Sequence, residues 1–427
     1  MPITHAIHDR EGESHGTNPA PLKVLFLMGY FPSVSTTFIF NQLTGLLDMG
    51  HDVSIVALKR SPDRVIHPLV RAYELPRRAR YINIPRNRIV RILKALFLFF
   101  TRFPAGPAMI LKSLNVARYK KDALNLNLFY YVLPFLGRKY DIIHCHFGPN
   151  GIIGAYLKTL GVAAKIITTF YGYDLTRLPR ENPAAYALLF KQGSLFLPIC
   201  DVFRQALLEL GCPARRVTVH PVGIDTQTFL PATDRNDTTD IHILTVANFV
   251  EKKGYAYALA AVARVMAAHK NLYYLICGDG HLRDQLQDQA EQLNIAARIT
   301  FTGKLAGDEL ARLYARAHIF LLPSVTAADG DQEGTPTVLL EAQSMGLPVI
   351  SSWHSGIPEI VRDGKTGILN REKDVDGIAA SLETLVSRPE LRREMGRAGR
   401  EFVMRNFDIK DLNNRLALIY RQAVRGG

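Results

Sequence analysis

The chain has 427 residues, 48% of them hydrophobic, which is too many for one ordinary core and favours two domains of roughly 200 residues each. No apolar run reaches the ~18 residues of a membrane-spanning helix, so we expect no such helix. The net charge of +13 is concentrated, because residues 59–121 hold 16 Lys or Arg and two acids while the rest carries a net −1. Residues 1–20 are polar, and we expect a disordered tail without a signal peptide there.

Short apolar runs alternate with segments of helical periodicity along the whole chain. This alternation predicts two doubly wound parallel sheets, each in its own α/β domain. We expect strands at residues 22–28, 53–58, 81–84, 141–147, 165–170, 195–199 and 216–220 in the first half, and at residues 241–247, 272–277, 298–302, 318–322, 348–352 and 367–369 in the second. The polar stretch 231–240 is the best linker. The expected parts are a first domain over residues 21–232, a second over residues 233–408, and a helix over residues 409–427 that can cross back to the first domain.

The positive charge surrounds an apolar run at residues 89–100 that is basic at its start and aromatic at its end. A basic amphipathic segment of this kind suits an anionic membrane surface, and we expect that contact through residues 86–121. The alternative is a core helix with a solvated basic flank. Nucleic acid is not expected as a partner, because no recognisable binding motif accompanies the patch.

Four cysteines, Cys145, Cys200, Cys212 and Cys277, are scattered along the chain, three of them in or beside apolar strand-like runs. This pattern predicts buried free thiols in a cytoplasmic protein. No set of His, Cys and Asp residues has the spacing of metal ligands, so no metal site is expected.

A helix is predicted over residues 336–345, with Thr335 as its N-cap and Pro336 at its first position. Its first-turn N–H groups form a ready site for an anion such as phosphate. Glu333 lies in the loop just before the helix, and Glu341 lies within it. Carboxylates accept hydrogen bonds from sugar hydroxyls, so the combination indicates a nucleotide sugar. The alternative is an acidic cap followed by a solvated helix glutamate.

Other candidate residues follow strands of the second domain, where parallel sheets bind their ligands. Lys253, followed by Gly254, stands at a strand-to-helix turn, where a lysine can reach a diphosphate and a glycine allows close backbone approach. Gly278 ends the next strand in a Gly-Asp-Gly turn. On its own, each feature is also explained by a surface lysine or a plain turn.

The first domain offers candidates at the same ends of its strands. Gly29 connects the first strand to its helix through a loop whose N–H groups and hydroxyls can face a phosphate across a cleft. His146 ends another predicted strand, and Tyr171 follows the strand after that. His146 is a reasonable polar ligand, although a satisfied structural histidine explains it as well.

The segment from Glu333 to Glu341 resembles the E-x7-E signature of retaining glycosyltransferases of the GT-B fold. The pieces most similar to colanic-acid-type glycosyltransferases are residues 146–149, 251–254, 323–331, 333–336 and 354–359. The resemblance covers nearly the whole chain after Leu22. It implies an α/β, GT-B architecture of two doubly wound Rossmann-like domains facing across a cleft. The N-terminal domain would take the acceptor and the C-terminal domain the nucleotide sugar.

The resemblance also implies roles for single residues. Glu333 would hold hydroxyls of the donor sugar near the anomeric carbon, and Glu341 would hold the ribose hydroxyls. Lys253 would neutralise the diphosphate leaving group in place of a metal. The backbone expected near the donor is that of Gly334, Thr335, Pro336 and Thr337, with Gly29 and Gly278 on neighbouring turns. The donor, a UDP- or GDP-sugar, is a substrate, and no cofactor is implied.

Three positions depart from the family's pattern. Family members often carry Arg at the position of Asn248, so one cation for the diphosphate is missing. Many carry His at the position of Tyr171, where it commonly faces the donor sugar. Thr36 is a lesser departure, because glutamate is common there.

The implied function is transfer of a sugar to a lipid-linked oligosaccharide in exopolysaccharide or cell-surface polysaccharide biosynthesis. The expected location is the cytoplasm, with the enzyme peripheral on the inner face of the cytoplasmic membrane. Two alternatives remain open. One is a non-catalytic scaffold that binds nucleotide sugar, and the other is a GT-B-like nucleotide-sugar epimerase or phosphorylase.

Overall fold

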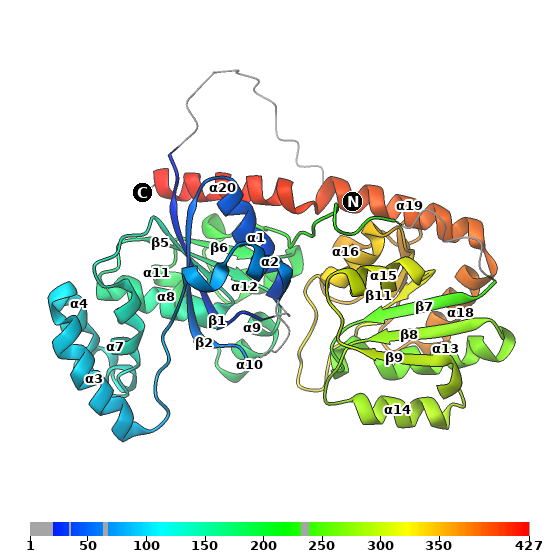
Figure 1. Ribbon diagram of the computed structural model, residues 1–427, viewed down its shortest axis with the longest axis horizontal. Helices are drawn as coiled ribbons and strands as arrows, with labels where there is room; N and C mark the ends of the chain where they lie inside the picture. The colour runs from blue at the N-terminus through cyan, green and yellow to red at the C-terminus, as the bar shows by residue number, and fades with distance from the viewer. Residues whose placement is uncertain (1–19, 34–35, 63–66, 232–238, 427) are drawn as a thin grey trace, which may run out of the picture.

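Two α/β domains lie side by side in the computed structural model, which describes residues 20–33, 36–62, 67–231 and 239–426 (Figure 1). The first holds a sheet in the order β3-β2-β1-β4-β5-β6, and the second holds one in the order β12-β11-β10-β7-β8-β9. Neighbouring strands in both sheets run parallel. Counted within its own domain, each sheet therefore has the doubly wound strand order 3-2-1-4-5-6. The expected fold class is confirmed.

Helices connect most successive strands in both domains. The strands are β1 (Lys23–Phe31), β2 (Asp52–Arg60), β3 (Ala79–Tyr81), β4 (Ile142–His146), β5 (Lys165–Phe170), β6 (Leu195–Pro198), β7 (Ile241–Val246), β8 (Leu272–Cys277), β9 (Ile299–Gly303), β10 (Ile319–Leu321), β11 (Val349–Ser352) and β12 (Gly367–Asn370). The first-domain helices are α1 (Thr37–Asp48), α2 (Pro68–Ala72), α3 (Arg88–Arg102), α4 (Pro107–Ser113), α5 (Val116–Tyr119), α6 (Lys121–Leu124), α7 (Asn127–Val132), α8 (Gly148–Leu160), α9 (Tyr173–Thr176), α10 (Leu178–Glu181), α11 (Ala187–Gln192) and α12 (Asp201–Glu209). The remaining helices are α13 (Tyr255–Ala268), α14 (Arg283–Gln292), α15 (Asp308–Arg316), α16 (Thr337–Ser344), α17 (Ile357–Ile360), α18 (Val375–Ser387), α19 (Pro389–Asn406) and α20 (Ile409–Arg425).

The first strand shows why this chain forms buried parallel sheets. Five consecutive apolar residues, Val24 to Met28, are buried, as expected for a strand with helices on both faces of its sheet. The strand does not end at Gly29 as expected. It continues to Phe31, because Tyr30 and Phe31 stay in register with β2.

The predicted strand at residues 216–220 is wrong. This segment runs beside β6 but makes only an isolated bridge, between Phe196 and Val217, among the described residues. The N–H of Thr218 donates to the carbonyl oxygen of Phe196 at 3.0 Å. A regular ladder also needs an N–H donated from β6, and Pro198 has none.

A lobe of helices, α3 to α7, lies between β3 and β4 and forms the outer end of the first domain (Figure 1). α3 begins where the side chain of Asn87 accepts hydrogen bonds from the N–H groups of Ile89 and Val90. Only Ala95 is buried among the residues of this helix. α3 is therefore an amphipathic helix with most of its surface in solvent.

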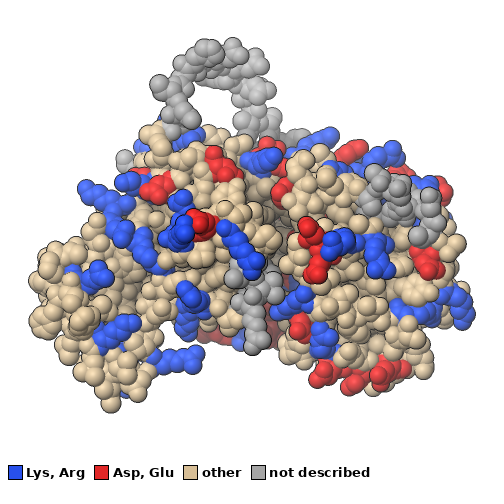
Figure 2. Space-filling view, in the orientation of Figure 1, with Lys and Arg blue, Asp and Glu red and all other residues tan. Residues whose placement is uncertain are grey.

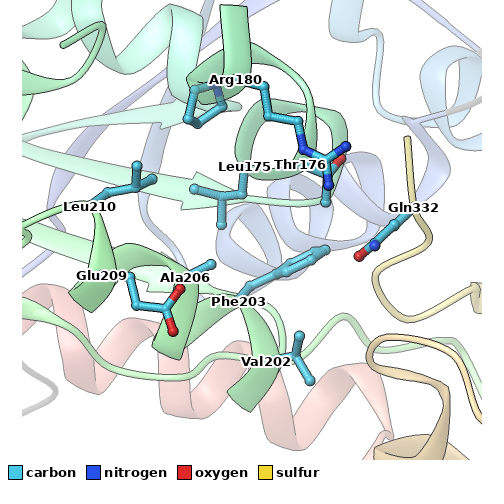
Figure 3. Close-up of a pocket in the computed structure, with 10 residues that line it drawn as sticks. Leu175, Thr176, Arg180, Val202, Phe203, Ala206, Glu209, Leu210 and Gln332 are labelled. Atoms are coloured by element: carbon cyan, nitrogen blue, oxygen red, sulfur yellow. The ribbon is translucent and has the colours of Figure 1, made fainter. Parts of the chain in front are cut away.

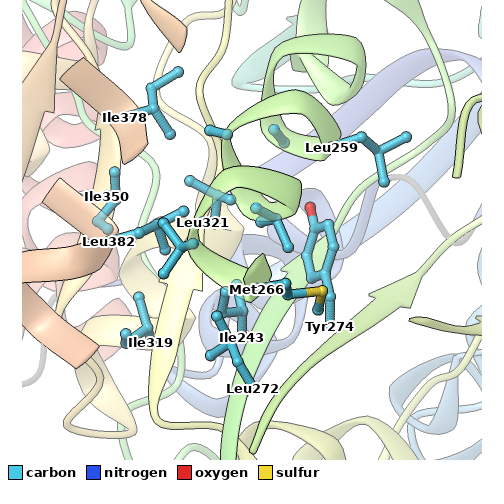
Figure 4. Packing of buried hydrophobic residues seen from close by; sticks show 14 of the residues in the cluster. Ile243, Leu259, Met266, Leu272, Tyr274, Ile319, Leu321, Ile350, Ile378 and Leu382 are labelled. Carbon is cyan, nitrogen blue, oxygen red and sulfur yellow. The ribbon is translucent and has the colours of Figure 1, made fainter. Parts of the chain in front are cut away.

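A core of apolar side chains holds the sheet of the second domain against α13 and α18 (Figure 4). The labelled members are Ile243, Leu259, Met266, Leu272, Tyr274, Ile319, Leu321, Ile350, Ile378 and Leu382. Full burial of one such side chain contributes about 1.5–3 kcal/mol. The buried hydroxyl of Tyr274 is paired with Thr245 Oγ1 at 2.7 Å. This core fixes β7, β10 and β11, and the loops of the candidate site start from their carboxyl ends.

The last helix, α20, leaves the second domain and packs on α1 of the first (Figure 1). The side chain of Tyr420 is fully buried there, and Asn413 Nδ2 donates to the carbonyl oxygen of Asn41 at 3.0 Å. The two segments that cross between the domains pair with each other, since the N–H of Ile409 donates to the carbonyl oxygen of Ile224 at 2.9 Å. The expected tail lies outside the described residues except for its last one, and residues 232–238 of the expected linker lie outside them too.

All four cysteines are buried free thiols, which confirms that expectation. Among the described residues, no helix combines the length and the hydrophobicity that crossing a bilayer requires.

Candidate active site

The helix that follows the two-glutamate motif starts later than predicted. α16 begins at Thr337, and Pro336 occupies the N-cap with φ −60° and ψ 115°. Thr335 therefore does not cap the helix, because the extended backbone of Pro336 moves the start of the helix one residue further along the chain. Its buried hydroxyl has no hydrogen-bond partner in the described part of the chain. That hydroxyl remains available to a ligand at the start of α16.

Glu333 lies in the loop between β10 and α16 and is only 6% exposed. Its Oε1 lies 2.8 Å from Lys253 Nζ and 3.8 Å from Lys252 Nζ. Burial alone would raise the pKa of Glu333, but the two lysines outweigh it and lower the pKa. Asp331 holds Lys252 from the other side at 3.0 Å. The structure thus brings Glu333 and Lys253 together as a buried ion pair.

A histidine fixes the backbone at Glu333. The N–H of Glu333 donates to His354 Nε2 at 3.0 Å. The other ring nitrogen, Nδ1, must then carry the proton, which it donates to Glu372 Oε1 at 2.6 Å. Glu372 also accepts from the N–H of Thr326 at 2.8 Å, so the loop is held at both of its ends. Sequence reasoning missed Glu372, since nothing near it in the chain signals a role.

Glu341 lies on α16 with its carboxylate turned to hydroxyl groups. Tyr314 of α15 donates its hydroxyl proton to Glu341 Oε2 at 2.8 Å. Burial raises the pKa of Glu341 to about 7, although hydrogen bonds from Tyr314 and Thr337 act in the opposite direction. Tyr314 carried no signal in the sequence, because it lies inside an ordinary amphipathic helix.

The turn that carries Lys253 packs closely on the loop before Glu333. Gly254 has φ +69°, and a Cβ there would collide with the carbonyl oxygen of Pro323. A Cβ on Gly278 would similarly collide with the carbonyl oxygen of Ala247. Asn248 is exposed, and its side chain makes no ion pair or hydrogen bond with the residues that the structure describes.

His146 and Tyr171 meet at the carboxyl ends of β4 and β5. His146 Nδ1 lies 2.8 Å from the hydroxyl oxygen of Tyr171, and both side chains are buried. Burial lowers the pKa of His146 to about 3, so the ring is neutral. Rings of Phe38 and Phe147 pack on Tyr171 at centroid distances of 4.7 and 4.6 Å. The hydroxyl of Tyr171 is therefore engaged inside the first domain.

The loop before α16 also touches the first domain directly. A Cβ on Gly334 would lie 2.5 Å from the carbonyl oxygen of Tyr171 and 2.6 Å from Ile199 Cδ1. Only glycine allows this approach, which places Glu333 at the boundary between the domains. Gly29 lies in β1 and is half-buried, with no atom within 4 Å of the place where a Cβ would stand.

Two family models cover most of the chain. The model for glycosyltransferase family 4 matches residues 35–228, and the model for glycosyl transferases group 1 matches residues 227–402. A putative colanic acid biosynthesis glycosyltransferase, WcaL of Salmonella typhimurium, is 34% identical over 93% of this chain and 98% of its own. The amylovoran biosynthesis glycosyltransferase AmsK of Erwinia amylovora is 34% identical over 84% of this chain and 90% of its own.

The chain belongs to the group 1 and family 4 glycosyltransferases. Solved glycosyltransferase structures show the same fold. HepE of Anabaena in complex with UDP and glucose has a TM-score of 0.70 at 16% identity, covering 93% of this chain and 99% of its own. The lipopolysaccharide outer core galactosyltransferase WaaB, in its apo form, has a TM-score of 0.64 at 16% identity, covering 94% and 100%. The expected GT-B architecture is therefore confirmed.

In this glycosyltransferase, several buried hydroxyl groups lie unpaired near the Glu333 loop. Ser324 follows β10, Thr335 precedes α16, and Ser355 follows β11; their hydroxyl oxygens have no partner within the described ranges. Buried polar groups in native proteins are nearly always satisfied. A ligand rich in hydroxyl and phosphate oxygens would satisfy these three.

A pocket of about 440 Å³ adjoins this loop on the side of the first domain (Figure 3). Leu175 and Phe203 give it apolar walls, and Arg180 and Gln332 supply polar groups. Gln332 comes from the second domain and directly precedes Glu333. The pocket therefore opens beside the candidate catalytic residues, between α9, α10 and α12.

Proposed function

We propose that this glycosyltransferase moves a sugar from a nucleotide-diphosphate sugar to a lipid-linked saccharide during exopolysaccharide or cell-surface polysaccharide biosynthesis. The observation that carries the proposal is the buried pair of Glu333 and Lys253 beside the start of α16, with Glu341 on the same helix. Relatives named for colanic acid and amylovoran biosynthesis support the pathway. A structural neighbour that holds UDP and glucose supports the donor class.

The N-terminus of α16 and Lys253 would receive the diphosphate of the donor. Glu341 would accept hydrogen bonds from the ribose hydroxyls, and Glu333 from hydroxyls of the transferred sugar. Lys253 then stabilises the negative charge that grows on the leaving diphosphate, and electrostatic stabilisation of this kind supplies much of the rate enhancement in many enzymes. No metal ion is needed for that step.

We propose that transfer retains the anomeric configuration. The bond between the anomeric carbon and the diphosphate oxygen breaks while the acceptor hydroxyl attacks from the same face. The acceptor's proton passes to the departing phosphate oxygen, so charge and atoms balance. Glu333, beside the anomeric carbon, would orient the sugar for this attack. The backbone of Tyr171, which lies against Gly334, would form part of the first-domain side of the cleft, with the side chain of His146 buried behind it.

We propose that the surface of α3 brings the enzyme to a membrane that carries the acceptor. Its exposed side includes Phe97 and Phe100, which are 67% and 74% exposed. Basic side chains appear among uncharged ones on the face of this lobe drawn in Figure 2. Apolar groups would enter the interface while Arg86 and Arg88 meet anionic headgroups. The enzyme would then work on the inner face of the cytoplasmic membrane, where a nucleotide sugar and a lipid-linked acceptor meet.

Release of nucleoside diphosphate tests the function. Wild-type protein is screened against UDP- and GDP-sugars with a lipid-linked acceptor, and transfer is seen as a mass shift of the acceptor. We expect Glu333→Ala and Lys253→Ala to lower the turnover by roughly 10²–10³-fold, while Glu390→Ala, at an exposed position of α19, leaves it unchanged. Equal turnover by all four proteins would remove Glu333 and Lys253 from the mechanism.

The exposed Asn248 favours a second candidate, a non-catalytic scaffold that binds nucleotide sugar. That scaffold would bind UDP or GDP tightly and release no product with any donor. Efficient turnover by the wild-type protein would exclude it, and an epimerase would change the donor without a mass shift of the acceptor.

A further inference from the structure

A second pocket, of about 420 Å³, lies in the second domain away from the candidate active site. His318 and Pro348 line it, and they directly precede β10 and β11. Glu333 and His354 follow the same two strands. The pocket therefore lies at the amino ends of strands whose carboxyl ends form the candidate active site.

The wall of this pocket is one side of α19. The residues that α19 contributes are Arg392, Arg393, Arg397, Arg400, Glu401 and Met404. An adjoining side of α19 packs on α16 and the turn after it, and glycines make that contact close. A Cβ on Gly396 would collide with the carbonyl oxygen of Gly346, and one on Gly399 would lie 3.2 Å from Gln343 Cγ. This packing fixes the position of α19 and so the side of the helix on which the arginines lie.

Two of these arginines are anchored to backbone carbonyl groups. Arg400 Nη1 donates to the carbonyl oxygens of Ser344 at 2.6 Å and Phe229 at 3.1 Å. Arg392 Nη1 donates to the carbonyl oxygens of Leu385 at 2.5 Å and Val386 at 2.9 Å. Burial lowers the pKa of both guanidinium groups, although both remain charged. Neither one has a carboxylate partner among the described residues.

The other two arginines, Arg393 and Arg397, make few or no interactions that stabilise the fold. Arg397 makes no hydrogen bond or ion pair with any described residue. Arg393 lies 4.0 Å from Glu390 in an exposed pair, which is a weak contact. Glu401 is the one carboxylate among the ten residues that line the pocket. Four arginines thus line this pocket with one acid, and the only other acid paired with them in the described structure is Glu390, through its weak contact with Arg393.

We propose that this pocket binds a small molecule that carries two phosphate groups, through Arg393 and Arg397, as a site separate from the donor site. Guanidinium groups match phosphate oxygens with paired hydrogen bonds, and a pocket of this size is typical for a nucleotide or sugar phosphate. The anchored Arg392 and Arg400 lose little side-chain freedom on binding, so the site is pre-organised. The proposal does not depend on the proposed function.

Calorimetric titration with inorganic pyrophosphate tests the proposal on the full chain. The donor site also attracts pyrophosphate, so Lys253→Ala is the background for every measurement. We expect the Lys253→Ala protein to keep one pyrophosphate site, in the pocket beside α19. Adding Arg393→Ala and Arg397→Ala should weaken that site by about tenfold or more, because two charge-assisted contacts are lost. The thermal midpoint should stay unchanged, since neither side chain holds the fold.

The control adds Arg405→Ala and Arg425→Ala, which remove the same charge outside the pocket, and it should bind like the background protein. Equal pyrophosphate affinity with and without Arg393 and Arg397 would overturn the proposal. A second arm uses phosphatidylglycerol vesicles. Loss of vesicle binding in the Arg393 and Arg397 variant, with pyrophosphate binding intact, would assign these arginines to a lipid headgroup and also overturn it.

Discussion

The carboxylate of Glu359, in the second domain, accepts hydrogen bonds from the backbone N–H of Asp201, in the first, with both oxygens 2.9 Å from the nitrogen. Asp201 is the first residue of α12, so a side chain of one domain caps a helix of the other. A second bridge joins Arg177 and Asp329 at 3.2 Å, but both side chains are half-exposed. Of these two interactions across the domain boundary, the hydrogen bonds to Glu359 are therefore the stronger.

Replacing Glu359 by Ala should loosen this boundary. The loss of a helix cap costs about 1 kcal/mol, so the thermal midpoint should fall by a few degrees. The KM for the donor should rise more than kcat falls, because the domains must close around the donor. Glu390→Ala serves as the control, and small-angle scattering should show a larger radius of gyration for the Glu359 variant alone. An unchanged radius of gyration would contradict the conclusion that Glu359 holds the two domains together.

Donor binding should depend on pH through Glu341. Its pKa is raised to about 7 by burial, and the carboxylate form is the better acceptor for ribose hydroxyls. The affinity for nucleoside diphosphate should therefore rise as the pH increases from 6 to 8. In Glu341→Gln this rise should vanish and the affinity at pH 8 should be lower. Titration calorimetry at several pH values measures both effects, and a pH-dependent Gln variant would point to another group.

The same residue should make the free protein less stable at neutral pH. A carboxyl whose folded pKa lies above its ordinary value of 4.5 binds its proton more tightly in the folded state. Stability is then lost as the pH rises through 4.5 to 7, by up to about 3 kcal/mol. Glu341→Gln should be more stable than wild type at pH 8 and similar to it at pH 4.5. Denaturant unfolding at the two pH values checks this trade between stability and donor binding.

Membrane contact should depend on the exposed aromatic residues of α3. Phe97→Ser with Phe100→Ser should abolish sedimentation with vesicles that contain phosphatidylglycerol, since burying each Phe contributes roughly 1.5–3 kcal/mol. Leu418→Ser is the control, because Leu418 is also an exposed apolar residue, 55% accessible, but lies on α20. Arg86→Ser with Arg88→Ser should weaken vesicle binding and make the remaining binding less sensitive to salt, because part of the electrostatic attraction is removed. Vesicle binding that survives the loss of both Phe side chains would refute the proposal that α3 binds the membrane.

Asn248 offers a gain-of-function test. Its side chain is exposed and makes no hydrogen bond or ion pair with the described residues, so Asn248→Ala should change neither stability nor turnover. Asn248→Arg would add a second cation near the diphosphate, and we expect turnover to rise by about tenfold. Stopped assays of nucleoside diphosphate release compare the three proteins. A rise with Ala as large as with Arg would show that removal of Asn248, rather than added charge, is responsible.

The alternation of apolar runs was enough to predict two doubly wound sheets, because a strand buried on both faces must be apolar throughout. The prediction of a strand at residues 216–220 was wrong because β6, which lies beside this segment, contains Pro198. Proline cannot donate the N–H that a regular ladder needs, and this matters only where the two segments lie side by side in the folded protein. The end of β1 was misplaced at Gly29, since pairing with β2 carries the strand further. Local pattern therefore gives the architecture, while strand ends depend on partners far along the chain.

The residues of the candidate site were predictable only where each of them belongs to a recognisable sequence motif. Glu333 and Lys253 were singled out from the sequence, and the structure brings them to 2.8 Å. Tyr314 and Glu372 were not found, because each acts through a partner on another element and sits in an unremarkable stretch of sequence. The cap at Thr335 was misassigned, because Pro336 adopts an extended conformation and takes the N-cap position itself.

The placement of α20 has a consequence for how the protein is made. Its 17 residues are synthesised after the rest of both domains, yet Leu416 and Tyr420 belong to the core of the first domain. That domain therefore exposes an apolar face until α20 has emerged from the ribosome and can cover it. We expect nascent protein to need a chaperone until then.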